Sequence, residues 1–267
     1  MNTEDPSDIT VLRITPNGNV SQFARIKPTD QKRVGSGMAT TPDRGLIMGG
    51  GTGLIQVNRR GIATHLNTTH HFESPNPIGV RPDGSVIILD RDQTWSLKGS
   101  KVTKLYTSPN SVTAGIVDAK GTVYLQGDTF ADMHVLAIGK NPRALTLRGN
   151  IPGSKVPLSN LTALTMAAAH DGGLYAKTVK DPSKGPSGPS AYVMHLAPSG
   201  DVVVIAKGTL ENGHASCKAG KMFPALNAPC QIPWFVVQSG DQVLAMGNPS
   251  TLTGPPAPAL SIRAYEK

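Results

Sequence analysis

The chain has 267 residues, with 29 Gly, 22 Pro and only 4% aromatic residues. So many Gly and Pro residues exclude a protein of long helices, while the length allows an extensive core of Val, Leu, Ile, Ala and Met. The formal net charge of +8 favours anionic partners. The basic residues are scattered, however, with Lys32-Arg33 and Arg59-Arg60 as adjacent pairs, so a generally solvated basic surface is the simpler interpretation.

Turn signals recur along the chain between short, alternating apolar segments. Each contains Gly with Asn, Asp or Ser beside it or close by, at residues 15–18, 81–85, 117–121, 170–173, 197–200 and 238–241. Because these residue types tolerate a positive φ, each segment predicts a tight hairpin between two strands. The chain is therefore predicted to be all-β.

The predicted strands group into units of four in up-and-down order. An N-terminal hairpin precedes them, and the last unit has three predicted strands. In chain order the strands are residues 10–14 and 20–26; 37–41, 46–48, 54–57 and 62–66; 78–80, 85–90, 93–97 and 102–106; 112–117, 122–126, 134–138 and 144–147; 164–168, 174–177, 192–196 and 202–206; and 234–237, 243–246 and 260–265. Repeats of about 40 residues with four strands each are typical of β-propeller blades.

We therefore predict a single domain over residues 1–267, a β-propeller of four-stranded antiparallel blades. Five blades are favoured and six are possible, because residues 10–14 and 260–265 both have the position of a third strand. The N-terminal hairpin is expected to complete the last blade and close the ring.

Strand direction sorts the connections onto two faces. Turns between first and second strands and between third and fourth strands are short and define a short-turn face. Connections between second and third strands and between units define a long-loop face. Its long segments are residues 27–36, 67–77, 128–132, 149–160, 178–190, 208–233 and 248–259. Since scaffolds carry binding residues on variable connections, the long-loop face is the predicted ligand surface.

Residues 77–90, with the sequence PIGVRPDGSVIILD, resemble the NHL repeat, whose pattern is Pro, Gly-Val, Asp, Gly, an apolar strand and a closing Asp. Weaker similarities lie at residues 115–124 and 225–229. After the closing Asp the family usually has an Asn-Arg-hydrophobic step, where this chain has Arg91-Asp92-Gln93. The resemblance implies a propeller used mostly for binding, as in extracellular sensor domains of bacterial kinases and RNA- or protein-binding platforms, and in a few cases a lyase.

Asp90, Arg91 and Asp92 end a predicted second strand near the mouth of the ring. Two carboxylates and a guanidinium could hold a cation or a polar ligand there. A self-neutralising exposed turn is the simpler interpretation.

Two further sets of candidate ligand residues lie in the long-loop face. His70 and His71, with Glu73, could form a metal corner, although adjacent histidines do not converge on one ion and solvated loop histidines explain them as well. Lys180 and Lys184 are expected in a basic rim that would attract an anionic partner.

The sequence contains no catalytic motif, neither a nucleophile elbow nor a complete phosphate loop. Cys217 and Cys230 are expected to form a disulfide, with two free thiols as the alternative. The bridge would place the protein in an oxidising compartment, secreted or as the ectodomain of a membrane protein, while a cytoplasmic location stays open. No apolar run is long enough to form a transmembrane segment.

The favoured function is a non-enzymatic binding or sensor domain, without cofactor or metal, for a protein, glycan or small anionic ligand. One alternative is a propeller hydrolase or lyase of the lactonase type, with Ca or Zn in the central channel. Another is an RNA-binding platform, in which nucleic acid would bind with a steep salt dependence.

Overall fold

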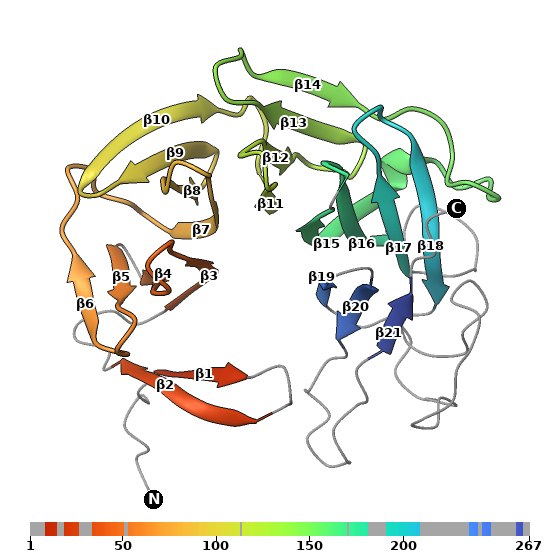
Figure 1. Cartoon of the computed structure of the whole chain (residues 1–267). Coiled ribbons are helices and arrows are strands. Elements are labelled where there is room, and N and C mark those ends of the chain that lie inside the picture. The colour runs from red at the N-terminus through yellow and green to blue at the C-terminus, as the bar shows by residue number, and fades with distance from the viewer. Residues whose placement is uncertain are drawn as a thin grey trace, which may run out of the picture. The chain divides into compact units, whose positions relative to one another are not determined.

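The described strands form antiparallel sheets in which each strand pairs with its neighbour in the chain (Figure 1). The computed structural model describes residues 9–14, 19–26, 34–50, 53–112, 114–169, 171–180, 191–208, 235–239, 242–246 and 260–263. The chain divides into two compact units, Met1–Ser111 (unit 1) and Val112–Lys267 (unit 2).

Unit 1 contains a two-stranded hairpin and two four-stranded sheets. The hairpin consists of β1 (Ile9–Ile14) and β2 (Val20–Ile26). The first sheet contains β3 (Val34–Thr40), β4 (Leu46–Gly50), β5 (Gly53–Val57) and β6 (Ala63–Leu66). The second sheet contains β7 (Pro75–Val80), β8 (Val86–Asp90), β9 (Gln93–Lys98) and β10 (Lys101–Thr107).

Unit 2 contains two four-stranded sheets and a three-stranded sheet. Its first sheet contains β11 (Ala114–Val117), β12 (Val123–Gln126), β13 (Asp132–Leu136) and β14 (Arg143–Thr146). The second contains β15 (Leu161–Ala168), β16 (Leu174–Lys180), β17 (Ala191–Leu196) and β18 (Val202–Gly208). The third contains β19 (Phe235–Ser239), β20 (Gln242–Met246) and β21 (Leu260–Arg263). The helix of the described residues is the 3-10 turn η1 (Leu158–Asn160), so no described helix could cross a membrane.

The predicted all-β class and the up-and-down units of four strands are confirmed. The first strands of successive sheets lie side by side, β3 with β7 in unit 1, and β11 with β15 and β15 with β19 in unit 2. The second strand β8 is buried along its whole length, whereas the fourth strand β10 is largely exposed. This gradient from inner to outer strands is consistent with propeller blades. The blade number, the closure of the ring and the single domain over residues 1–267 stay predictions.

Alternation along the strands builds the core of unit 1. Ile47 and Leu54 point to one face of the first sheet and pack against Val86 and Ile88 of the second. Their neighbours in the chain point to the other face, where Met48 packs toward the hairpin. Since successive strand residues face opposite sides, the first sheet buries apolar side chains on both faces.

In unit 2 the core lies between the first two sheets. Met133 and Val135 of β13 pack with Leu174 and Ala176 of β16 and with Met194 of β17. The turn before β12 is fixed by the Asp118 carboxylate, which accepts hydrogen bonds from two backbone N–H groups of the same turn, at 2.9 and 2.7 Å. The recurrent Asp therefore explains the predicted turns, because its side chain caps their amides.

The described long loops carry buried apolar side chains. Phe72 packs between the two sheets of unit 1. Phe130, Ile151 and Leu158 all join the core of unit 2. These segments are therefore anchored to the core by their apolar side chains.

Candidate functional site

The turn between β3 and β4 presents an arginine at its tip. The Thr41 N–H donates to the Gly45 carbonyl at 2.9 Å, and the Asp43 carboxylate accepts from the Thr41 hydroxyl at 2.5 Å. Arg44 has a φ of 64°, in the left-handed region that is costly for a residue with a Cβ. The turn thus holds the Arg44 side chain away from the strands, at the short-turn face.

The turn between β5 and β6 presents two more arginines, Arg59 and Arg60. Asn58 stabilises this turn, because its side-chain oxygen accepts from the N–H groups of Arg60 at 2.9 Å and Ile62 at 3.1 Å. Both arginines are exposed.

The hairpin β1–β2 brings a fourth arginine to the same place. Gly61 approaches the Phe23 carbonyl so closely that a Cβ added to it would lie 2.0 Å from that oxygen. This approach places β2 beside the β5–β6 turn, and its partner strand β1 brings Arg13 to the same hollow. The Arg13 guanidinium lies 4.5 Å from the centroid of the Phe23 ring, a cation–π contact that helps to orient it.

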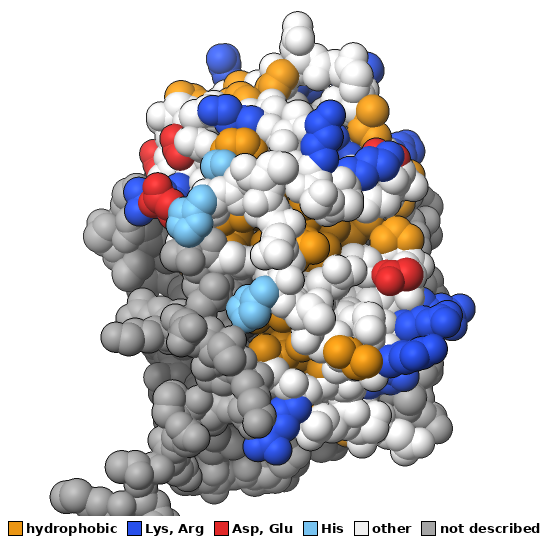
Figure 2. All heavy atoms as spheres, turned by 90° about the vertical axis from the view of Figure 1, so that its left-hand side faces the viewer, with side chains coloured by type: hydrophobic (Ala, Val, Ile, Leu, Met, Phe, Trp, Pro, Cys, Tyr) orange, Lys and Arg blue, Asp and Glu red, His pale blue; other side chains and the backbone are white. Residues whose placement is uncertain are grey.

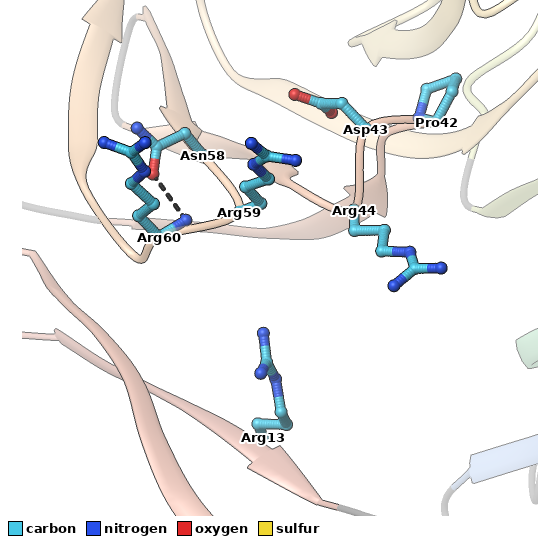
Figure 3. Close-up of a pocket in the computed structure, with 7 residues that line it drawn as sticks. All are labelled: Arg13, Pro42, Asp43, Arg44, Asn58, Arg59 and Arg60. Atoms are coloured by element: carbon cyan, nitrogen blue, oxygen red, sulfur yellow. Dashed lines mark hydrogen bonds between the residues drawn. The ribbon is translucent and has the colours of Figure 1, made fainter.

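The four arginines line one hollow in the short-turn face of unit 1 (Figure 3). In Figure 3 the Arg13 side chain extends from β1 toward the turns, while the Arg44 side chain extends from its turn away from Arg59 and Arg60. The volume is about 770 Å³, within the range of roughly 300–1,000 Å³ that is usual for small-molecule sites. We call it the arginine hollow; its lining residues are Arg13, Pro42, Asp43, Arg44, Asn58, Arg59 and Arg60.

Positive charge dominates the arginine hollow. Asp43 supplies the carboxylate of the lining, and the described ion pairs lie elsewhere in the chain. The hydrogen bond from Thr41 holds the pKa of Asp43 below its ordinary value, with a smaller contribution from Arg59. The hollow therefore combines several guanidinium groups with an ionised carboxylate, and its net charge suits an anion.

The predicted Asp90–Arg91–Asp92 cluster lies at the end of β8 and in the turn before β9. The buried Asp90 carboxylate accepts from the N–H groups of Glu73 and Ser74, the latter at 2.6 Å. Arg91 has a φ of 57° and forms an exposed ion pair with Glu73. Arg91 and Asp92 form the tight turn between β8 and β9, so Asp90 holds the preceding loop in place.

His70 and His71 lie in a second hollow of unit 1, of about 600 Å³, together with His65. The His70 ring stacks on Trp95, with 3.9 Å between ring centroids and an interplanar angle of 27°. Figure 2 shows histidine side chains at the surface on this side of the molecule. His70 is therefore held by aromatic packing, and it meets Phe72 edge-on.

The other predicted residues are only partly described. Lys180 is the last residue of β16, so the strand extends three residues beyond its predicted end at residue 177. Lys184, Cys217 and Cys230 lie outside the described residues. The expected disulfide and the expected basic rim stay predictions.

None of the four arginines is among the ligand residues that the sequence predicts, because the predicted ligand surface is the long-loop face. The signal in the sequence is the adjacent pair Arg59-Arg60. Arg13 and Arg44 are isolated in the sequence. The pairing of β4 with β5 brings Arg44 near Arg59, and the docking of the hairpin brings Arg13.

Within the described ranges, no group of three or more His, Cys, Asp or Glu side chains is arranged to hold a metal ion. Two of the described histidines lie near a carboxylate. The His134 Nε2 is 3.6 Å from the Asp132 Oδ1, and the His195 Nε2 is 3.1 Å from the Asp171 Oδ2.

Comparison with known proteins informs the fold. No protein-family model and no curated protein sequence matches the chain. A catalytically inactive variant of virginiamycin B lyase from Staphylococcus aureus, with quinupristin, is similar in structure, with a TM-score of 0.55 and 11% identity over 88% of this chain and 70% of the lyase. A streptogramin B lyase has a TM-score of 0.52 and 10% identity, over 88% of this chain and 83% of its own.

A third similar structure is the extracellular domain of BT4673 from Bacteroides thetaiotaomicron, named as a hybrid two-component system. Its TM-score is 0.51 at 13% identity, and the match covers 91% of this chain but 31% of that one. Identities this low show the fold alone. The chain has an all-β, propeller-like fold of four-stranded antiparallel sheets.

Proposed function

We propose that this chain is a binding or sensor domain without catalytic activity, which recognises a small anionic ligand in the arginine hollow. The observation that carries the proposal is the meeting of Arg13, Arg44 and Arg59 with a single carboxylate, Asp43, in one hollow. Each guanidinium can form two parallel hydrogen bonds to a carboxylate or phosphate group.

The ligand should carry more than one anionic group. The arginines come from three separate elements, the strand β1 and two turns. Their guanidinium groups can therefore contact anionic groups at different positions in the hollow. The Asp43 carboxylate would repel an anionic group of the ligand that lies next to it, and it would accept a hydrogen bond from a ligand hydroxyl there. Citrate, with three carboxylates and a hydroxyl, is a suitable probe of this chemistry.

A sensor role outside the cytoplasm fits the similarity in fold to the extracellular domain of BT4673. In this proposal the chain binds its ligand at the short-turn face of unit 1. The long-loop face, where the sequence predicts ligand residues, stays an alternative surface for a protein or glycan partner.

The proposal is tested by calorimetric titration of the full chain with citrate and with inorganic pyrophosphate, in low and in high salt. We expect saturable binding to at least one probe, weakened by salt and lowered about tenfold or more by Arg44→Ala or Arg59→Ala, because each loses a charge-assisted contact. Lys101→Ala removes one exposed charge of β10 outside the hollow and should leave the affinity within about twofold. Equal affinity in all three variants would exclude the arginine hollow as the site.

A second candidate function is a divalent-metal-dependent lyase or hydrolase, favoured by the similarity in fold to two lyases. Elemental analysis of the purified protein separates the two candidates. Stoichiometric Ca or Zn that survives dialysis would favour the enzyme. A protein that has been freed of metal by chelator treatment and dialysis, and that still binds citrate with unchanged affinity, favours the binding domain.

A further inference from the structure

Unit 2 has a hollow of its own, lined by residues at or beside its short turns. It lies between its first and second sheets and has a volume of about 330 Å³. We call it the lysine hollow; its lining residues are Asp118, Lys120, Thr122, Tyr124, Val135, Ala137, Lys140, Asn141, Arg143, Gly172 and Pro198.

Tyr124 connects the two sheets at the base of this hollow. Its hydroxyl donates a buried hydrogen bond to the Gly172 carbonyl at 2.8 Å, in the turn between β15 and β16. Lys120 reaches over the same turn, since a Cβ added to Gly172 would lie 3.2 Å from the Lys120 Nζ. The Lys120 ammonium therefore lies near the turn of the second sheet.

Three cations surround the hollow, and the nearby carboxylates are engaged with other groups. Lys120 comes from the β11–β12 turn, Lys140 comes from the β13–β14 connection, and Arg143 is the first residue of β14. The Asp118 carboxylate is buried and caps its own turn. Asp171, in the neighbouring turn, accepts from the Gly173 N–H at 2.9 Å and lies 3.1 Å from the His195 Nε2.

Part of the lining of the lysine hollow is apolar. Val135, Ala137 and Pro198 line it beside the ring of Tyr124. Burial, followed by the Asp118 carboxylate, raises the pKa of the Tyr124 hydroxyl, so the hydroxyl stays protonated and adds no negative charge. A ligand here meets an amphipathic surface with a cationic rim.

We propose that the lysine hollow binds a small organic anion with one carboxylate or phosphate group and an apolar or aromatic body. The anionic group would contact Lys120, Lys140 and Arg143, and the body would lie on Val135 and Ala137. The volume, near the lower end of the roughly 300–1,000 Å³ usual for ligand sites, limits the body to about one ring. This site is independent of the arginine hollow.

The test is calorimetric titration of the full chain with phenyl phosphate, phenylacetate and inorganic phosphate at low salt. We expect either aromatic anion to bind at least fivefold more tightly than inorganic phosphate, because the ring buries apolar surface. Tighter binding of phenyl phosphate identifies a phosphate ester as the ligand class, and tighter binding of phenylacetate identifies a carboxylate. If inorganic phosphate binds as tightly as both, the amphipathic site is excluded.

Variants with matched charge locate the site. Lys120→Ala combined with Arg143→Ala should lower the affinity for the preferred aromatic anion at least tenfold. Arg148→Ala combined with Lys155→Ala removes the same charge from exposed positions outside the hollow and should change it less than twofold. Equal losses in both double variants would show non-specific attraction and overturn the proposal.

A background variant separates this site from the arginine hollow. Arg44→Ala with Arg59→Ala should leave the binding of the aromatic anion intact, whether or not it removes citrate binding. Loss of aromatic-anion binding in that background would assign it to the arginine hollow instead. Circular dichroism of every variant confirms that the fold is retained.

Discussion

Gly61 lies directly against the backbone of Phe23: a Cβ built on Gly61 would be 2.0 Å from the Phe23 carbonyl oxygen. This is closer than any side chain could approach without moving the hairpin β1–β2 away from the β5–β6 turn. Gly61 also has a φ of 80°, which disfavours other residues. The close approach of these two residues sets the distance between Arg13 and the arginines of the turn.

Gly61→Ala should therefore destabilise unit 1 and weaken binding in the arginine hollow together. We expect the free energy of unfolding to fall by about 2 kcal/mol or more, because Ala is disfavoured in the left-handed region and its Cβ clashes with the Phe23 carbonyl. The matched control is Gly99→Ala, because Gly99 has a φ of 61° but an added Cβ would meet nothing within 4 Å. In the control the free energy of unfolding should fall by only about 1–2 kcal/mol, and the affinity for citrate should be unchanged. Urea denaturation and calorimetry measure both effects; equal losses of stability would mean that the hairpin yields freely.

Substitutions of Arg44 should affect anion affinity and the free energy of unfolding differently. Arg44→Gly removes a guanidinium and relieves a left-handed residue at the same time, since Arg44 has a φ of 64°. The free energy of unfolding should stay constant or rise by up to about 1 kcal/mol, while anion affinity falls about tenfold. Arg44→Ala should lose the same affinity without the gain in stability. Retained affinity in both variants would remove Arg44 from the site.

Asp90 and Asp92 are neighbours in one predicted ligand cluster, but they should behave differently. Asp90→Ala leaves the N–H groups of Glu73 and Ser74 without their acceptor, and we expect a loss of about 2–4 kcal/mol in unfolding free energy. Asp92→Ala should stay within about 0.5 kcal/mol, as for most partly exposed positions. Thermal denaturation of both variants checks this difference. A similar loss at the two positions would contradict the structural role of Asp90.

The strands and turns of this chain could be predicted because their determinants are local. Alternating apolar residues and a Gly beside Asp, as around Asp118, require no knowledge of distant contacts. The arginine hollow could not be predicted in the same way, since Arg13 and Arg59 meet only after the hairpin docks at Gly61.

Three of the described long loops have a structural role that their sequence does not reveal. Phe72, Phe130 and Ile151 lie in segments that look irregular in the sequence, yet all three are buried. Whether such a side chain enters the core depends on the space between neighbouring sheets, which the sequence does not reveal. The same holds for Asp90, whose acceptor role depends on how the loop before β7 folds back.

Lys177 gives the chain a distinct dependence on alkaline pH. Its side chain is fully buried in β16, and burial lowers its pKa from 10.5 to about 8. Because the folded state binds this proton less readily than the unfolded state, the cost of charging is fully present below pH 8 and disappears as the pH rises toward 10.5. The free energy of unfolding should therefore rise across that interval by on the order of 2–3 kcal/mol, and Lys177→Met should abolish the rise. Urea denaturation of both proteins from neutral to alkaline pH measures it, with Lys207→Met, at an exposed position of β18, as the control that keeps the wild-type slope. A flat profile in the wild type would mean that Lys177 keeps its ordinary pKa and is hydrated in solution.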